Sequence, residues 1–483
     1  MGIIARQSIR NLLSSYTGFF FGAVNTLLLY PYFLTDAYFG LIGFLLSTAN
    51  IMMPLLAFGV PNSLVKFYTF YQKPEDQQKF TFLMLFLPLL VILPTGFIGV
   101  VAYREIAGLL ASKNNIIEDY VWAIYLIGAS MAYFEVFYSW AKIHMKTVFG
   151  NFMKEVFHRV VIMFLLLIVY FQDLSMHNFI IALTLMYVSR TVLMFFSAVK
   201  VKKPELRFTF PENYKNVFRY SALIVVAGSV AVVLLDIDKF MLGQYISIEN
   251  IAFYNVAIFT AMVIIVPSRA MHQITYPITA KLMNDKNKKG LADLYKRSSI
   301  TLFAVSGLLF LLIVLNIKEL YFLLPAQYSQ GLLVVILISL AKLSESIIGN
   351  NNSIIYNSDY YRIMLLFGVL LAVFTVILNM IFIPVWGING SAFATLLAFL
   401  LYNAIKIWFV HKKFKIHPFS KGTVKIAFLL VCFTTLFFFW DFKFHPLLNI
   451  GLKAILISTA YIAFILKLSV SDDINTILRK FLK

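Results

Sequence analysis

The stretch that decides the fold class is IMLLFGVLLAVFTVILNMIFI, residues 363–383. These twenty-one residues include no charged side chain. A helix of about 20 apolar residues is long enough to cross the hydrocarbon core of a bilayer. The apolar residues run continuously rather than alternating with polar ones, which favours a helix over a strand of a membrane barrel. The stretch therefore predicts a transmembrane helix.

The rest of the chain has the same character. Of its 483 residues 61% are hydrophobic and 13% are charged, whereas a soluble domain has about 25% charged residues. The longest segments between the apolar runs are the loops 104–119, 200–219 and 274–298, which have 16 to 25 residues, too few for a soluble catalytic domain. We predict an all-α polytopic membrane protein of about 14 transmembrane helices. The thirteen further spans are 11–35, 38–65, 81–103, 120–141, 156–171, 178–199, 220–242, 251–273, 299–316, 329–350, 388–410, 424–440 and 450–468.

The basic residues give these spans an orientation. If the N-terminus is cytoplasmic, the segments on the inner side hold 32 of the 41 Lys and Arg residues and the outer loops hold four. Lys406 is counted here with the inner segment 406–425. Basic residues concentrate in the cytoplasmic loops of membrane proteins. We therefore predict an even number of spans with the N- and C-termini both cytoplasmic.

The net charge of +19 follows from this topology. A nucleic-acid-binding protein gathers its bases with stacking aromatic residues on one face, whereas here the bases are spread over short loops. The sequence contains no phosphate-binding loop, no HExxH helix and no Cys-x-x-Cys pair, and Cys432 is its single cysteine. We predict no nucleic-acid partner, no cofactor, no metal site and no enzymatic activity. Membrane lipids are expected partners, because juxtamembrane bases attract anionic headgroups.

Eight ionisable residues within the predicted spans are the candidate functional residues. An ionisable group at the centre of a membrane helix costs about 2.5–3.5 kcal/mol or more, so it usually faces a protein interior or a water-filled cavity. The eight residues are Glu135, Arg190, Asp236, Asp238, Lys239, Arg269, Lys342 and Glu345.

Two pairs among these residues admit two interpretations. Asp236 and Lys239 are three residues apart, as are Lys342 and Glu345, so each pair shares one helix face. Each pair is either purely structural or part of a functional site. A carboxylate that is alternately desolvated and placed beside a base can release and bind a proton or a sodium ion. The candidates for such ion coupling are Glu135, Asp236, Asp238 and Glu345.

Arg190 and Arg269 have no acidic residue one helical turn away. Arginine keeps its charge and offers a planar fork of donors that fits phosphate oxygens. Arg269 also follows Pro267, which removes a backbone hydrogen bond and can kink the helix. Either each arginine has an acidic partner in another span, or the two face a water-filled cavity that accepts an anion. We favour the cavity.

A weak internal repeat divides the chain. Tyr38 and Pro61 in the second span have the same separation as Tyr254 and Pro277 in the eighth, 216 residues later. We predict two six-helix lobes followed by two additional spans and a cytoplasmic tail, and repeats of this kind place a cavity between lobes in transporters. The predicted parts are 1–205, 206–415 and 416–483.

Three segments resemble a known family. They are LLDIDKFMLGQYISIENIAFYNVAIF (234–259), LNMIFIPVWGINGSAFAT (378–395) and YFGLIGFLLSTANIMMPLLAFGVPNSLVKFY (38–68). They are similar to segments of the polysaccharide flippases (Wzx type) for O-antigen and capsule repeat units, in the multidrug/oligosaccharidyl-lipid/polysaccharide (MOP) exporter superfamily. The matching positions are Gly59, Lys66, Asp236, Lys239, Leu242, Gly243, Tyr254, Asn379, Pro384, Gly387 and Gly390.

The resemblance implies a MATE-like fold in the bacterial cytoplasmic (inner) membrane. It also implies that the protein moves an undecaprenyl-diphosphate-linked oligosaccharide between leaflets by alternating access, coupled to a proton or sodium gradient. Polysaccharide polymerase and assembly proteins become expected partners. Under this interpretation the residues that contact the pyrophosphate and sugars are Arg190, Arg269, Lys342 and Lys239.

Three alternatives remain at this level. A small-molecule antiporter of the same superfamily usually has an acidic residue within span 1, whereas Asp36 lies at its outer end. A lipid II flippase typically has several arginines in spans 1 and 2, whereas this chain has only Arg6 and Arg10 before span 1. A membrane enzyme acting on lipid-linked sugars would need catalytic groups in the largest outer loop. The candidates there are Arg104, Glu105, Glu118 and Asp119.

Overall fold

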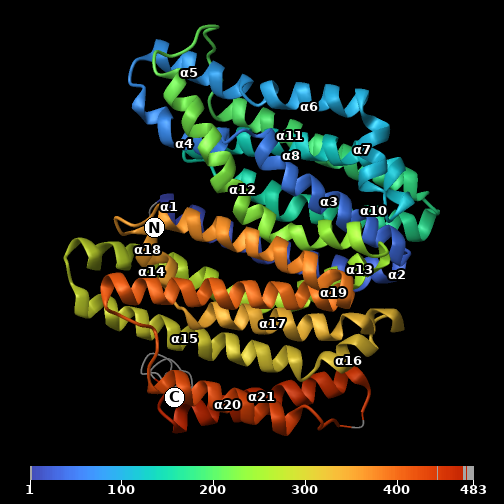
Figure 1. Ribbon diagram of the computed structural model, residues 1–483, viewed down its shortest axis with the longest axis vertical. Coiled ribbons are helices and arrows are strands. Elements are labelled where there is room, and N and C mark those ends of the chain that lie inside the picture. Colours follow the sequence, from blue (N-terminus) through green and yellow to red (C-terminus); the bar gives the residue numbers. More distant parts are fainter. Residues whose placement is uncertain (1–2, 443, 471–474, 476–483) are drawn as a thin grey trace. The chain divides into compact units, whose positions relative to one another are not determined.

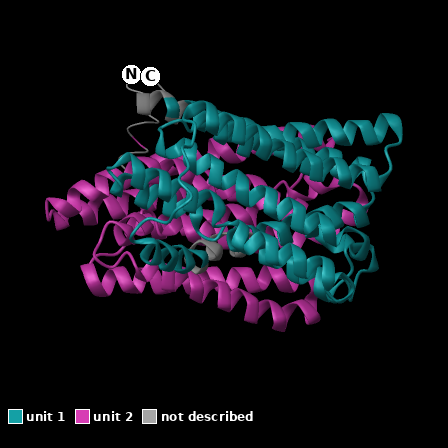
Figure 2. Ribbon diagram, turned by 90° about the horizontal axis from the view of Figure 1, so that it is seen from above, with its two compact units in different colours: residues 1–252 teal, residues 253–483 magenta. Residues whose placement is uncertain are grey.

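The computed structural model describes residues 3–442, 444–470 and 475. Every regular element in these residues is a helix. The chain divides into two compact units, residues 1–252 and 253–483 (Figure 2). The predicted boundaries of the two six-helix lobes, at residues 205 and 415, stay predictions. The end of the predicted cytoplasmic tail lies outside the described residues.

Unit 1 is a bundle of twelve α-helices, several of them interrupted (Figure 1). Its helices are α1 (Ile3–Ala23), α2 (Tyr30–Phe33), α3 (Asp36–Leu56), α4 (Val60–Phe67), α5 (Pro74–Phe86), α6 (Leu89–Val101), α7 (Tyr103–Leu110), α8 (Val121–Ile143), α9 (Val148–Phe152), α10 (His158–Gln172), α11 (Met176–Val201) and α12 (Tyr214–Tyr245). The π-helical segments Val24–Leu29 and Met153–Phe157 and the 3₁₀ segments Tyr68–Phe70 and Asn115–Tyr120 connect some of them. Its centre is formed by α8, which packs along both α3 and α11.

Helix α13 (Glu249–Ala261) begins at the boundary, and the remaining helices belong to unit 2. They are α14 (Val266–Asn284), α15 (Lys288–Val314), α16 (Ile317–Phe322), α17 (Leu332–Ile347), α18 (Asn351–Tyr356), α19 (Ile363–Phe414), α20 (Lys421–Phe437) and α21 (Pro446–Lys467). The 3₁₀ segments are Met262–Ile265 and Ala326–Gly331. The centre of this unit is α17, which packs against α15 and α19.

Each predicted span overlaps one helix, two successive helices or half of α19. Ten helices among the described residues are long and apolar enough to cross a membrane. Large apolar side chains such as Phe97, Val100 and Phe439 are exposed, as expected for surfaces that face lipid. The chain is a multi-pass membrane protein, as predicted, whereas the count of fourteen spans and the orientation of the termini stay predictions.

The helices extend beyond the apolar runs that predicted them. The segment 274–298 was expected to be an inner loop, but α14 continues to Asn284 and α15 begins at Lys288. Helix N-capping explains the short break, because the Asn287 side chain accepts a hydrogen bond from the Gly290 amide at 2.9 Å. A search for apolar runs finds the part of a helix that lies inside the bilayer, and it misses the polar turns by which the helix continues beyond the bilayer.

Two glycines lie at breaks between helices. Gly387 has φ 57° and ψ −130° within α19, so its two halves are separate helices (Figure 1). An unbroken helix of 52 residues would be ~78 Å long, far more than a bilayer needs. Gly59 has φ 67° between α3 and α4, and a Cβ atom there would lie 2.3 Å from the Ser221 carbonyl oxygen on α12. Both positions favour glycine because it lacks a Cβ atom.

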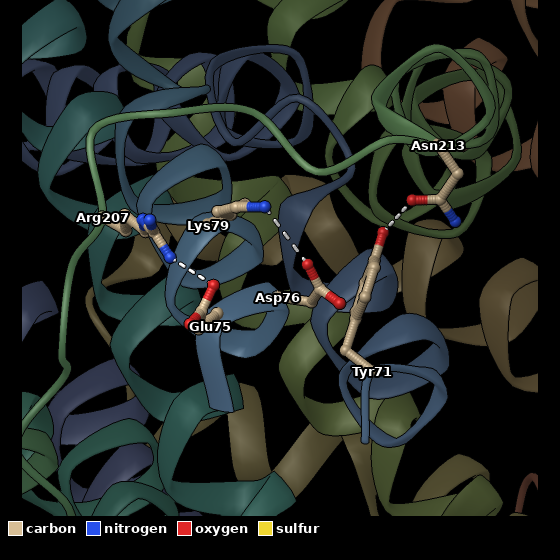
Figure 3. Close-up of polar contacts among 6 residues, drawn as sticks. All are labelled: Tyr71, Glu75, Asp76, Lys79, Arg207 and Asn213. Carbon is tan, nitrogen blue, oxygen red and sulfur yellow. Dashed lines mark hydrogen bonds and ion pairs between the residues drawn. The ribbon is translucent and has the colours of Figure 1, made fainter. Parts of the chain in front are cut away.

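The basic linker 202–213 between α11 and α12 lies against the start of α5 (Figure 3). The Trp140 indole of α8 donates to the Lys202 carbonyl oxygen at 2.9 Å, and the Gln78 amide donates to Glu205 at 2.8 Å. These contacts hold the linker on unit 1. The polar pairs in Figure 3 are Tyr71 with Asn213, Arg207 with Glu75, and Lys79 with Asp76.

Candidate functional site

Arg190 is buried in the middle of α11, with 6% of its surface exposed. Its guanidinium carbon lies 4.3 Å from the ring centroid of Phe134 on α8 and 4.8 Å from that of Tyr187, one turn earlier. Aromatic faces attract a desolvated guanidinium. Its Nε atom is buried and has no hydrogen-bond partner among the described residues. The arginine therefore retains donor capacity for a further ligand.

A carboxylate lies near this arginine. The Glu135 Oε1 atom on α8 is 2.5 Å from the Lys154 Nζ atom, and the positive charges of Lys142 and Arg190 also act on this carboxylate. The Glu135 charge acts on Arg190, whereas the ion pair of Glu135 is with Lys154, so the choice between a partner and a cavity for Arg190 stays a prediction. One carboxylate nevertheless faces three cations, so positive charge is in excess here. We name Glu135, Lys142, Lys154 and Arg190 the unit-1 centre.

Irregular helices surround the unit-1 centre. Lys154 belongs to the π-helical segment Met153–Phe157, and a second π-helical segment is Val24–Leu29. The Asn25 side chain of the second segment donates to the Arg159 carbonyl oxygen at 2.8 Å. π-Helical turns occur frequently at functional sites. Sequence reasoning missed Lys154 because hydropathy does not show where a helix widens.

Asp236 and Lys239 pair as their spacing predicted, with 2.7 Å between Oδ1 and Nζ. The negative charge of Asp236 acts on the Tyr187 hydroxyl, which places this pair within electrostatic range of the ring that covers Arg190. Asp238, a further candidate for ion coupling, is buried. All three residues belong to unit 1.

Arg269 lies in unit 2 and is exposed. It follows Pro267 at the start of α14, directly after the 3₁₀ segment Met262–Ile265, so the helix is irregular where the proline predicted a kink. Among the described residues no ion pair of Arg269 is found within 4.0 Å. An arginine at this depth is stable only where water or an anion reaches it.

Lys342 and Glu345 on α17 lie 3.9 Å apart, between Nζ and Oε2. Lys342 is 7% exposed, and its Nζ atom lies 4.2 Å from the ring centroid of Phe399 on α19. The predicted pair is therefore formed, although at a distance too long for a strong hydrogen bond.

Lys406 lies where the predicted span 388–410 overlaps the inner segment 406–425, and the charge count assigned it to the inner segment. Helix α19 continues to Phe414, and Lys406 is only 1% exposed. Its Nζ atom donates to the Asn352 Oδ1 atom at 3.0 Å and lies 4.1 Å from the Tyr402 ring centroid. The charge of Glu345 acts on it. We name Lys342, Glu345 and Lys406 the unit-2 centre.

The comparison with solved structures identifies the fold. The lipid II flippase MurJ in an inward-closed conformation matches with a TM-score of 0.71 at 15% identity, over 96% of this chain and 99% of that chain. An inward-facing multidrug resistance MATE family transporter of the MOP superfamily matches with a TM-score of 0.63 at 13% identity, over 86% and 98%. A MOP superfamily transporter from Pyrococcus furiosus gives 0.56 at 13% identity, over 86% and 95%.

These similarities confirm the predicted MATE-like MOP fold. The matched proteins are described as a flippase and as transporters. No curated protein sequence matches this chain. The sequence model of the family described as "Polysaccharide biosynthesis protein" matches residues 4–283, more than half of the chain. The chain belongs to this polysaccharide biosynthesis protein family.

Proposed function

We propose that this protein moves an undecaprenyl-diphosphate-linked oligosaccharide repeat unit from the inner to the outer leaflet of the bacterial cytoplasmic membrane by alternating access. A diphosphate and several sugars cannot cross hydrocarbon unaided, because desolvating them costs too much free energy. The family match and the MOP transporter fold support a transport role in polysaccharide assembly.

The observation that carries the proposal is the excess of positive charge in the unit-1 centre, where Lys142, Lys154 and Arg190 face the carboxylate of Glu135. The nearby Glu155 is paired with a further base, Arg159. Such a centre suits an anionic headgroup and disfavours a cationic drug. Arg269, Lys342 and Lys239 are the further candidates for contacts to the pyrophosphate and sugars.

Ion coupling belongs to the same proposal. Glu135, Asp236, Asp238 and Glu345 are the candidates to bind a proton or a sodium ion during the cycle. Each lies beside a base or is buried, so a change in hydration or in the position of the base changes its protonation. The polymerase that extends the repeat unit at the outer face is the expected assembly partner.

The test is translocation of a fluorescent undecaprenyl-diphosphate oligosaccharide in proteoliposomes. We expect Arg190→Ala and Arg269→Ala each to slow translocation by roughly tenfold or more, since a charge-assisted hydrogen bond contributes about that factor. Arg297→Ala is the matched control, because Arg297 forms an exposed ion pair with Asp293 at 2.9 Å. The proposal fails if the wild type moves only lipid II, or only small cations against a proton gradient.

A further inference from the structure

The two charged centres occupy equivalent places in the predicted repeat. The unit-1 centre has its carboxylate on the fourth predicted span and Arg190 on the sixth. The unit-2 centre has its carboxylate on the tenth span and Lys406 on the twelfth. Glu345 follows Glu135 by 210 residues and Lys406 follows Arg190 by 216, close to the 216-residue offset of the sequence repeat. In each unit the two helices pack along one another, α8 with α11 and α17 with α19.

The chemistry of the two centres is also equivalent. In each, a buried base lies against a tyrosine on its own helix, Tyr187 for Arg190 and Tyr402 for Lys406. A carboxylate on the neighbouring helix acts on that base and pairs with a second cation, which is Lys342 in unit 2. The same four groups therefore occur in both units: a buried base, the tyrosine ring beside it, a carboxylate on the neighbouring helix and a second base.

The unit-2 centre has more positive than negative charge. Glu345 forms an ion pair with Lys342, and its charge also acts on Lys406, whose hydrogen bond goes to the neutral amide oxygen of Asn352. Lys406 is more deeply buried than any other member of either centre. A buried charge without full compensation is costly within a membrane protein, and an anionic ligand would remove that cost.

We propose that Lys406, together with Lys342, forms a second diphosphate-binding centre in unit 2, in which Glu345 is a resident counter-ion that the phosphate displaces. This proposal rests on the proposed function, because its ligand is the headgroup of that substrate. Glu345 pairs with Lys342, and its negative charge also acts on Lys406. The diphosphate displaces the Glu345 carboxylate because it carries more negative charge and more acceptor oxygens than the carboxylate does. Lys406 and Glu345 should therefore have opposite effects on binding.

The experiment measures undecaprenyl diphosphate binding by calorimetry, with the full-length protein in nanodiscs of zwitterionic phosphatidylcholine. We expect Lys406→Met to weaken binding by roughly tenfold or more and Glu345→Gln to tighten it severalfold. Lys412→Met is the control, because Lys412 is exposed on the same helix. A purely structural pair would lower the melting temperature in both variants, and Glu345→Gln would not tighten binding. That result overturns the proposal.

Further arms separate the ligand sources and the two proposals. Inorganic pyrophosphate should compete in the wild type and lose that ability in Lys406→Met. If phosphatidylglycerol in the nanodisc competes equally well, the centre binds any lipid phosphate and the diphosphate assignment is wrong.

If Lys406→Met fails to fold, Glu345→Gln alone decides: tighter binding of undecaprenyl diphosphate supports the proposal, and unchanged or weaker binding overturns it. If Arg190→Ala stops translocation while Lys406→Met and Glu345→Gln bind normally, the second centre is wrong and the proposed function stands. A wild type that translocates no lipid-linked sugar contradicts the proposed function itself.

Discussion

At the residue scale, one glycine illustrates how closely the helices of unit 1 approach one another. Gly59 combines a positive φ with a position where a Cβ atom would meet the backbone of α12. The neighbouring Ser63 and Ser221 hydroxyl oxygens lie 2.6 Å apart. A backbone oxygen cannot change rotamer as a side chain can, so a larger residue at position 59 would displace α12.

We predict that Gly59→Ala destabilises the protein by about 1–3 kcal/mol, because it adds strain at positive φ and a clash with the Ser221 carbonyl. The measurement is the melting temperature in detergent. Gly99→Ala is the matched control, since a Cβ atom at Gly99 meets nothing within 4 Å. Equal melting temperatures for the two variants would contradict the close approach of α3–α4 and α12.

At the element scale, a polar cluster fastens the last two helices to α16. The Lys453 Nζ atom on α21 lies 2.6 Å from Asp441 Oδ1, and the Asn449 amide donates to Glu319 Oε1 at 2.8 Å. Burial, together with the neighbouring Asp441 carboxylate, raises the pKa of Glu319. Burial alone would raise the pKa of Asp441 as well, but the neighbouring Glu319 side chain and the hydrogen bond from Lys453 hold the pKa of Asp441 below its usual value.

This cluster predicts a pH dependence of stability. A carboxyl group whose pKa is raised by folding stabilises the protein below its unfolded pKa, ~4.3 for glutamate, and loses this contribution as pH rises through the folded pKa. We expect Glu319→Gln, which keeps a donor for Asp441, to gain melting temperature relative to the wild type as pH rises above ~4.3. Glu118→Gln, at an exposed site, should follow the wild type. If the melting temperatures of Glu319→Gln and the wild type differ by the same amount at every pH, the pKa of Glu319 is not raised by folding.

The linker 202–213 gives a second prediction at this scale. Trp140→Phe removes the hydrogen bond to the Lys202 carbonyl, a contribution of about 1 kcal/mol, so tryptic cleavage of the basic linker should be roughly fivefold faster. Trp122→Phe is the matched control, since it removes a bond of the same length, 2.9 Å, to the Asp119 carbonyl before α8. Equal cleavage rates for the two variants would show that the indole does not hold the linker. Arg207→Ala should have less effect than Trp140→Phe, because exposed ion pairs contribute little.

At the scale of the whole molecule, the distribution of bases makes the topology testable. In a Cys432→Ser background, Lys113→Cys should react with a membrane-impermeant maleimide in intact cells, because its loop is predicted to be outside. Lys289→Cys should react only after permeabilisation, since it follows the inner end of α14. Both residues are exposed, so accessibility depends on sidedness alone. The reversed pattern would place both termini outside.

The sequence by itself determined the class of this protein. Continuous apolar runs and loop charges are local properties, and lipid enforces them on every span, so residues 363–383 predict their helix without knowledge of any neighbour. The i, i+3 pairs Asp236–Lys239 and Lys342–Glu345 were predictable for the same reason, because helix geometry alone brings them together.

Only the tertiary structure decided which charges meet across helices. Glu135 pairs with Lys154 from a π-helical turn, and Glu345 acts on Lys406, which is 61 residues later on another helix. No fixed spacing in the sequence predicts either partnership, because each depends on how two helices pack and where a helix ends. Lys406 lies in the sequence where a predicted span meets a basic segment, and its burial follows from the continuation of α19 to Phe414 and from the packing of α19 on α17.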